Sequence, residues 1–291
     1  MAADPVVAML APYAALLLGL VVGSFLNVLI LRLPRRMQAE LDEACAAMRD
    51  EGTEPLPNRW LGLDFLITPA STCPNCGHSI RAWENIPVLS YLLLRGRCSS
   101  CSTPIGLRYP VVEAVTGLLS LLVVVHFGPT APAAAALVLL WGLVALTVID
   151  LDEQLLPDQL TLPLVWLGLL VNLDGMFTDL SSAVIGAASG YLSLWFVFQF
   201  FRLLTGREGM GYGDFKLLAV FGAFLGWQML PLIVLLSSLI GALVGISLVL
   251  LRGRDRQLPI PFGPYLAAAG FVALLWGEEI NRAYLQLTGL S

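Results

Sequence analysis

Charged residues are scarce in this sequence: Asp, Glu, Lys and Arg make up only 13% of its 291 residues, whereas 57% are hydrophobic. A soluble domain has about a quarter charged residues, so this shortage excludes an ordinary soluble protein. Together with the mean hydropathy of +0.81, the composition predicts a polytopic membrane protein. The net charge of −5 says little about partners, because the placement of the charges carries more information.

No basic residue precedes the first apolar run, which covers residues 6–31. A cleavable signal peptide carries positive charge before its apolar stretch, so this run is expected to remain as a membrane helix. The basic cluster of Arg32, Arg35 and Arg36 follows the run instead. Because positive charge favours the cytoplasmic side, we expect a periplasmic N-terminus and a cytoplasmic loop after the first helix.

The apolar runs predict an all-α polytopic membrane protein with about eight transmembrane helices. Each crossing of ~30 Å of hydrocarbon needs about 20 residues, and a helix satisfies its backbone hydrogen bonds internally. With this number of crossings, all of the 16 basic residues except Arg282 lie in or beside cytoplasmic segments. The expected spans, of which the sixth is short, are residues 6–31, 111–127, 131–149, 159–177, 180–203, 215–226, 228–251 and 260–284.

Cysteine is also rare, yet four of the five cysteines form two matched pairs inside the predicted cytoplasmic loop. The two-residue gap within each pair lets both thiolates reach one tetrahedral zinc ion. Two disulfides or a redox-active dithiol are the alternatives. The reducing cytoplasm disfavours disulfides, and two matched pairs fit a metal site better than a single dithiol. We therefore predict a zinc-ribbon-like insertion whose ligands are Cys73, Cys76, Cys98 and Cys101.

The rest of this loop carries weaker signals. Residues 37–54 predict a short polar helix, and the apolar residues 91–97 predict either a strand or a helix lying against the membrane surface. Cys45 lies outside the paired pattern and is expected to be a free thiol. His78 follows the first pair, but four cysteines already complete a structural zinc site, so we do not expect it to be a ligand.

Two acidic positions stand at the ends of apolar runs. Asp150 closes the third predicted span, and Asp214 opens the sixth, directly after Gly211 and Gly213. The predicted topology places both at the cytoplasmic face. Ionisable residues near hydrocarbon are costly and usually functional. Two carboxylates that share a site do not both ionise easily, so one stays protonated while the other activates water, as in aspartyl proteolysis.

Several residues near these acids have simpler interpretations. Asp158 follows Pro157 and is expected to be the N-cap of the next helix, and Asp152 is expected to be a solvated loop charge like its neighbour Glu153. Lys216, the only lysine, either pairs with an acid or marks the membrane interface, and the interface is favoured. Glycines at 211 and 213 allow the backbone, or an extended peptide, to approach Asp214 closely.

These segments together resemble the bacterial type IV prepilin peptidases, a family of GxGD-type membrane aspartyl proteases that are also N-methyltransferases. The resemblance covers nearly the whole chain and is carried by "GLVVGSFLNVLILRLPRR", "CPNCGHSIRAWENIPVLSYLLLRGRCSSC", "RYPVVE", "IDLDEQLLPDQLTLP" and "GMGYGDFKLLA". It implies that Asp150 and Asp214 are the catalytic pair. It also implies cleavage, after a glycine, of the leaders of type IV prepilins and type II secretion pseudopilins, followed by methylation of the new N-terminal residue with S-adenosylmethionine.

The same resemblance implies a location in the bacterial inner membrane and a division of labour along the chain. Residues 1–31 are expected to be the first transmembrane helix, residues 32–110 a methyltransferase-associated loop, and residues 111–291 the protease domain. The chain has no glycine-rich fingerprint of Rossmann type, so the methyl-donor site, placed by the resemblance in the N-terminal half, has no assigned residues. Membrane lipid is an expected partner and nucleic acid is not.

Two other classes of function compete with this interpretation. A proton- or cation-coupled transporter also uses paired acids in the membrane. Against it, the acids gather at one face, and no inverted repeat of broken helices is visible. An inactive membrane scaffold with a zinc ribbon would leave both acids unexplained.

Overall fold

The computed structural model describes residues 5–49, 64–67, 70–207, 210–252 and 261–288. In these ranges its regular elements are helices, and β-pairing is limited to the isolated bridges Thr72–Ser79 and Arg97–Pro104. The all-α prediction is therefore confirmed. The chain divides into two compact units, Met1–Val125 and His126–Ser291, which are described separately below.

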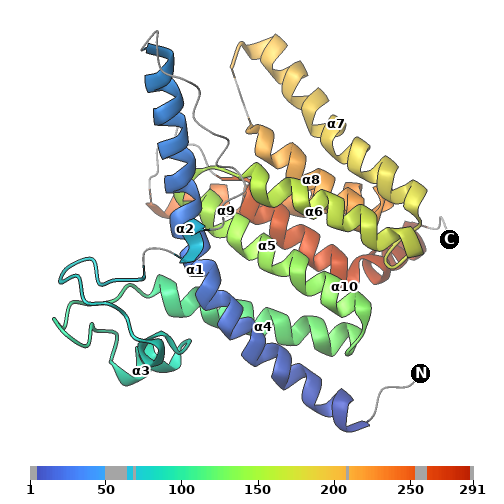
Figure 1. Cartoon of the computed structure of the whole chain (residues 1–291). Coiled ribbons are helices and arrows are strands. Elements are labelled where there is room, and N and C mark those ends of the chain that lie inside the picture. The colour runs from blue at the N-terminus through green and yellow to red at the C-terminus, as the bar shows by residue number, and fades with distance from the viewer. Residues whose placement is uncertain (1–4, 50–63, 68–69, 208–209, 253–260, 289–291) are drawn as a thin grey trace. The chain divides into compact units, whose positions relative to one another are not determined.

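Eight long helices coincide with the eight predicted spans (Figure 1). Within the part of the chain that the structure describes, five segments are long and apolar enough to cross a membrane: Pro5–Met48, Arg108–Phe127, Ala131–Glu153, Leu180–Thr205 and Trp227–Ser247. The multi-pass prediction is thus confirmed. The eight helices are α1 (Pro5–Arg49), α4 (Arg108–Phe127), α5 (Ala131–Glu153), α6 (Asp158–Val171), α7 (Leu180–Thr205), α8 (Tyr212–Leu225), α9 (Leu230–Arg252) and α10 (Gly263–Thr288).

Two predicted boundaries were wrong. The polar residues that follow the first span do not form a separate helix, because α1 continues through Pro34 to Arg49; residues 50–54 of that prediction lie outside the described part. The fourth span ends at Val171 rather than at residue 177. There the chain turns so that the buried Asn172 side chain donates to the carbonyls of Ala223 and Phe224, at 2.8 and 2.9 Å.

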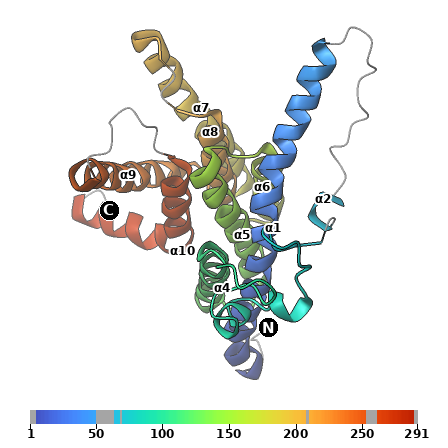
Figure 2. The same ribbon diagram turned by 90° about the vertical axis from the view of Figure 1, so that its left-hand side faces the viewer.

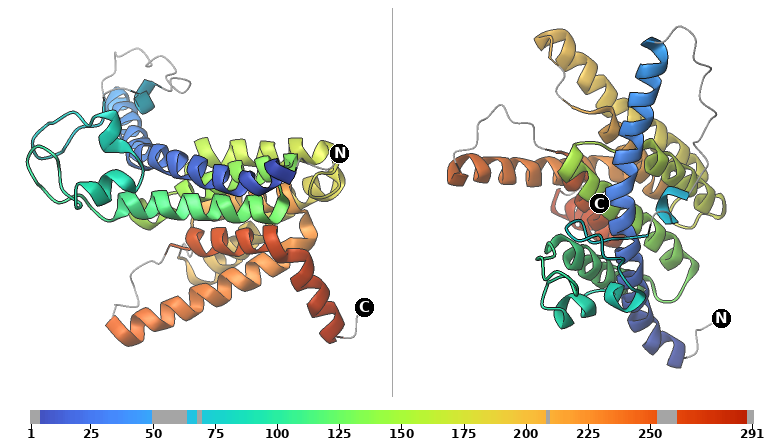
Figure 3. Two further views of the ribbon diagram at one scale, coloured as in Figure 1. Left: turned by 90° about the horizontal axis from the view of Figure 1, so that it is seen from below. Right: turned by 60° about the vertical axis from the view of Figure 1, so that its left-hand side comes forward.

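Unit 1 contains α1, α4 and the connecting segment with the short helices α2 (Asp64–Ile67), η2 (Ala82–Asn85) and α3 (Leu89–Leu93). Of the segment 91–97, residues 91–93 belong to α3, whereas Arg97 lies in an isolated β-bridge with Pro104. Figure 3 shows α1 running along α4. Their contact depends on small residues, since a Cβ added at Gly19 would lie 2.5 Å from Ser120 Oγ. Such close approach is typical of helix pairs in membranes.

Unit 2 is built around α8. Every residue from Asp214 to Phe224 except Lys216 is buried, so this helix of 14 residues forms the core although it is short for a membrane span. α7 packs on it backbone to backbone: a Cβ at Gly222 would lie 2.1 Å from the Gly186 carbonyl oxygen. α9 and α10 pack against each other in the same unit (Figure 2). Helix α8 is therefore enclosed by the rest of unit 2.

Candidate functional site

Asp150 lies in the last turns of α5 and is only 5% exposed. Its Oδ2 accepts a hydrogen bond of 3.0 Å from the backbone N–H of Gly263, the first residue of α10. The first N–H groups of a helix have no partner within the helix, and they carry partial positive charge. The start of α10 therefore fixes the position of the Asp150 carboxylate.

Asp214 lies in the first turn of α8 and is 7% exposed. Its backbone N–H donates to the Gly211 carbonyl at 3.3 Å, which closes the turn after the N-cap residue Gly211. Asp150 is near enough to act electrostatically on Asp214. The structure thus brings together the two acids that the sequence predicted, both within unit 2 and both at helix ends.

Leu156 fills the space beside the two acids. It is 8% exposed, and its side chain faces two glycines. A Cβ added at Gly213 would lie 2.6 Å from Leu156 Cβ, and one added at Gly263 would lie 2.6 Å from Asp150 Oδ2 and 3.3 Å from Leu156 Cδ2. At Gly211 the nearest atom would be 4.0 Å away. Gly213 is therefore needed for packing, whereas the space beside Gly211 is open.

We expect Gly213→Ala to lower the stability of the protein by about 1–3 kcal/mol, because the added methyl group overlaps Leu156. Gly211→Ala is the matched control two residues away, and thermal unfolding in detergent should leave its midpoint at the wild-type value. Equal midpoints for the two variants would show that Leu156 does not confine Gly213.

Lys216 and Asp158 form an ion pair, with 2.5 Å between Nζ and Oδ1. The expected N-cap role of Asp158 is wrong: Pro157 occupies the N-cap position of α6, and Asp158 is the first helical residue with its carboxylate on Lys216. Lys216 therefore pairs with an acid, which is the alternative that the sequence analysis did not favour. Asp152 and Glu153 are exposed, as expected, but they lie in the last turn of α5 rather than in a loop.

The four paired cysteines meet in unit 1, where their sulfur atoms all lie within 4.8 Å of one another. All are free thiols, and the Sγ atoms of Cys73 and Cys101 are 3.8 Å apart. Tetrahedral zinc with Zn–S bonds of about 2.3 Å separates its sulfurs by about 3.8 Å, so the cluster fits zinc. Cys45 is exposed and lies outside the cluster.

The two cysteine pairs have the same backbone geometry. Cys73 accepts from Gly77 N–H at 2.9 Å, and Cys98 accepts from Ser102 N–H at 3.0 Å, each with its carbonyl oxygen. Each pair is therefore a compact turn that holds two thiols on one side. Hydrogen bonding with Thr103, through its side chain and then its backbone, lowers the pKa of Cys101 to about 5, whereas burial and the neighbouring cysteines raise the pKa of Cys76 to about 11.

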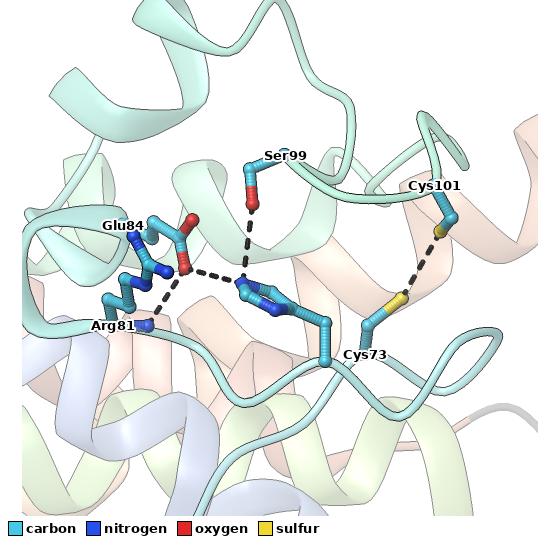
Figure 4. A network of polar contacts seen from close by, with 6 residues as sticks. Cys73, Arg81, Glu84, Ser99 and Cys101 are labelled. Atoms are coloured by element: carbon cyan, nitrogen blue, oxygen red, sulfur yellow. Dashed lines mark hydrogen bonds and ion pairs between the residues drawn. The ribbon is translucent and has the colours of Figure 1, made fainter.

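His78 is engaged away from the cysteines by Glu84 and Ser99, and Figure 4 labels these two partners. Its Nε2 lies 3.2 Å from Glu84 Oε2 and 3.4 Å from Ser99 Oγ. Ser99, then the Arg81 N–H and then His78 hydrogen-bond to the Glu84 carboxylate, which lowers the pKa of Glu84 to about 2. This network ties the first cysteine turn to the second, and it agrees with the prediction that His78 is not a zinc ligand.

Comparisons with known proteins cover nearly the whole chain. Residues 137–246 match the type IV leader peptidase family, and residues 17–127 match the bacterial peptidase A24 N-terminal domain. Relatives named "Prepilin leader peptidase/N-methyltransferase" occur in Pseudomonas aeruginosa (57% identity over 94% of this chain and 93% of the relative), Aeromonas hydrophila (56%, 92% and 92%) and Stutzerimonas stutzeri (54%, 95% and 94%). No solved structure is a significant match.

Proposed function

Because the chain belongs to the type IV leader peptidase family, we propose that it cleaves the leader peptides of prepilins and type II secretion pseudopilins and then methylates the new N-terminus. The observation that carries the peptidase half is the pair of buried carboxylates, Asp150 and Asp214, in electrostatic range of each other. The transporter alternative finds no support in this family.

We assign the two acids different parts of the reaction. A hydrogen bond from an N–H group stabilises the charged form of a carboxylate, so Asp150, which accepts from Gly263, is the base that takes a proton from water. Asp214, buried beside that negative charge, donates a proton to the glycyl carbonyl oxygen. Water oxygen bonds to the carbonyl carbon, the C–N bond breaks, and the departing nitrogen gains a proton.

The substrate fits this site if it lies along the membrane. A prepilin leader is basic and precedes an apolar helix, so its scissile bond reaches the membrane face where the acids lie. We assign the protein to the inner membrane, with lipid around its apolar helices, a periplasmic N-terminus and the acids at the cytoplasmic face, because its basic residues gather on one side of the predicted spans. The proposed domains follow: residues 1–31, the loop 32–110 and the protease domain 111–291.

The methyltransferase half is assigned to unit 1. The cysteine cluster holds a structural zinc ion, which would fix the two cysteine turns of the loop. S-adenosylmethionine supplies the methyl carbon: an N–C bond to the new N-terminus forms as the C–S bond breaks, and the amine loses a proton.

Mass spectrometry tests both halves in one experiment. Purified protein in detergent is incubated with a prepilin, first alone and then with S-adenosylmethionine. The leader mass should be lost in both cases, and the mature product should gain the mass of one methyl group only with the methyl donor. Intact prepilin after incubation would refute the peptidase, and a cleaved but unmethylated product would refute the methyltransferase alone.

Gly263 is proposed as a positioning residue for Asp150. We expect Gly263→Ala to lower kcat for cleavage by about 100-fold, because the new methyl group displaces the carboxylate from its hydrogen bond. KM should stay within about 2-fold, since the substrate contacts are not altered. Gly277→Ala, on the same helix and next to the flexible Met229 side chain, is the control. Wild-type kcat in Gly263→Ala would refute this role.

A further inference from the structure

Unit 1 contains a buried acid that leader cleavage does not use. Glu113 lies in the membrane helix α4 and is only 8% exposed. Its Oε2 accepts a hydrogen bond of 2.7 Å from the backbone N–H of Val88. The Ser24 hydroxyl lies near the carboxylate and donates to Asn85 Oδ1 at 3.4 Å. Neither group is a cation, and no ion pair to Glu113 occurs among the residues that the structure describes. A carboxylate in this position is costly and points to a function.

The residue that donates to Glu113 has a strained backbone. Val88 has a φ of 59° and a ψ of −45°, a conformation that a β-branched residue rarely adopts. Such strain persists where the surroundings enforce it, and it gathers at ligand sites. Val88 stands at the N-cap of α3, so the connecting segment presents this N–H to the carboxylate from outside the helix pair.

A second acceptor lies one turn away along the same helix contact. Asn27, 5% exposed, donates through Nδ2 to the Tyr109 carbonyl at 3.1 Å, but its Oδ1 is buried without a hydrogen-bond partner. On α4, Tyr109 lies one helical turn before Glu113. On α1, Gly23 lies one helical turn before Asn27. The glycine brings the helices together here, since its added Cβ would lie 2.7 Å from Glu113 Cα.

We propose that Glu113 and Asn27, with Ser24 beside them, bind the primary ammonium group of a methyl-transfer reactant. An ammonium carries one positive charge and three N–H donors. Its positive charge would neutralise the Glu113 carboxylate, and one of its N–H groups would donate a hydrogen bond to Asn27 Oδ1. A neutral ligand could make the hydrogen bond but could not neutralise the carboxylate. Hydrogen bonds between charged groups are the strong ones in a low-dielectric setting. This inference rests on the proposed methyltransferase function and gives it a binding residue.

Two reactants carry such a group: S-adenosylmethionine in its amino-acid portion, and the cleaved pilin at its new N-terminus. Equilibrium binding of tritiated S-adenosylmethionine to the full-length protein in detergent tests the first. Glu113→Gln keeps the shape and removes the charge, so its Kd should rise at least about 10-fold. S-adenosylhomocysteine keeps the ammonium but lacks the sulfonium charge, and its affinity should fall equally.

A separate experiment tests the second reactant, the N-terminus of the cleaved pilin. If the pilin N-terminus is the ligand, Glu113→Gln leaves the Kd for S-adenosylmethionine unchanged but raises the KM of a mature pilin peptide at least about 10-fold. An N-acetylated peptide, which has no ammonium, should then bind the wild type and the variant equally. Unchanged binding of both reactants would overturn the proposal.

Three controls separate this test from loss of fold and from failure of the proposed function. Thr116→Val alters a buried α4 hydroxyl that bonds to its own helix and should bind both reactants like the wild type. Leader cleavage by Glu113→Gln should match the wild type.

If Glu113→Gln does not fold, Glu113→Asp is tested in its place. Its carboxylate is withdrawn by one methylene, so binding should still weaken, and wild-type affinity would overturn the proposal. A wild type that methylates nothing refutes the methyltransferase itself, whereas equal methylation by wild type and Glu113→Gln refutes only the assigned site.

Discussion

We expect Asp150→Asn and Asp214→Asn each to lower the rate of leader cleavage by at least about 10³-fold while the protein still folds. Asparagine keeps the size of each side chain but neither takes a proton from water nor gives one to the carbonyl oxygen. Because the two acids act on one water and one peptide bond, the double variant should lose little more than either single variant. Single-turnover cleavage of a prepilin, followed by mass spectrometry, measures these rates.

Asp158→Asn is the matched control for this experiment. It removes a third carboxylate of unit 2, but one that is exposed and paired with Lys216. Exposed ion pairs contribute about 0–1 kcal/mol, so cleavage should stay within a few-fold of the wild type. Near wild-type cleavage by either Asp150→Asn or Asp214→Asn would mean that the pair is not catalytic. Losses that multiply in the double variant would mean that the two acids act separately.

The fold was largely predictable because a long apolar run in the sequence indicates a membrane helix. The residues of α5 and α7 are apolar over enough length to span a bilayer whatever their neighbours are. The wrong predictions concerned the ends of helices, which the local amino-acid composition does not determine. α1 runs on past Pro34 and Arg36, because residues 37–49 contain no proline or glycine that would end the helix. α6 ends earlier than predicted because the Asn172 side chain hydrogen-bonds to the end of α8. The local sequence does not reveal this tertiary contact.

The site was predictable only in part, for a related reason. Asp150 and Asp214 stood out because acids next to hydrocarbon need an explanation. Gly263 did not, because its importance comes from the N–H that it offers to Asp150, more than a hundred residues away in sequence. The "PFGP" segment at the start of α10 was the available signal, since proline is common in the first turn of a helix. Glu113 was missed too, because a lone glutamate near a helix start looks like an interfacial charge until its burial is known.

Removal of zinc gives the second large effect. We expect one zinc ion per chain, and replacement of Cys73 and Cys98 by serine should abolish it, since each cysteine turn would lose one of its two thiolates. The apparent free energy of structural zinc binding is about 10–16 kcal/mol in small domains, far more than the few hydrogen bonds within each turn supply. Residues 70–107 should therefore become sensitive to protease, and elemental analysis with limited proteolysis measures both changes.

The loss of zinc should also separate the two activities. The cysteine turns and the segment that carries Val88 belong to unit 1, and the Val88 N–H contacts Glu113. Methylation should therefore fall much further than cleavage, whose acids lie in unit 2. Cys45→Ser, which changes an exposed thiol outside the cluster, is the control and should keep its zinc and both activities. If the wild-type protein contains no metal and yet resists protease in the cysteine loop as well as the Cys45→Ser control does, that result would show that the packing of the thiols alone holds the loop.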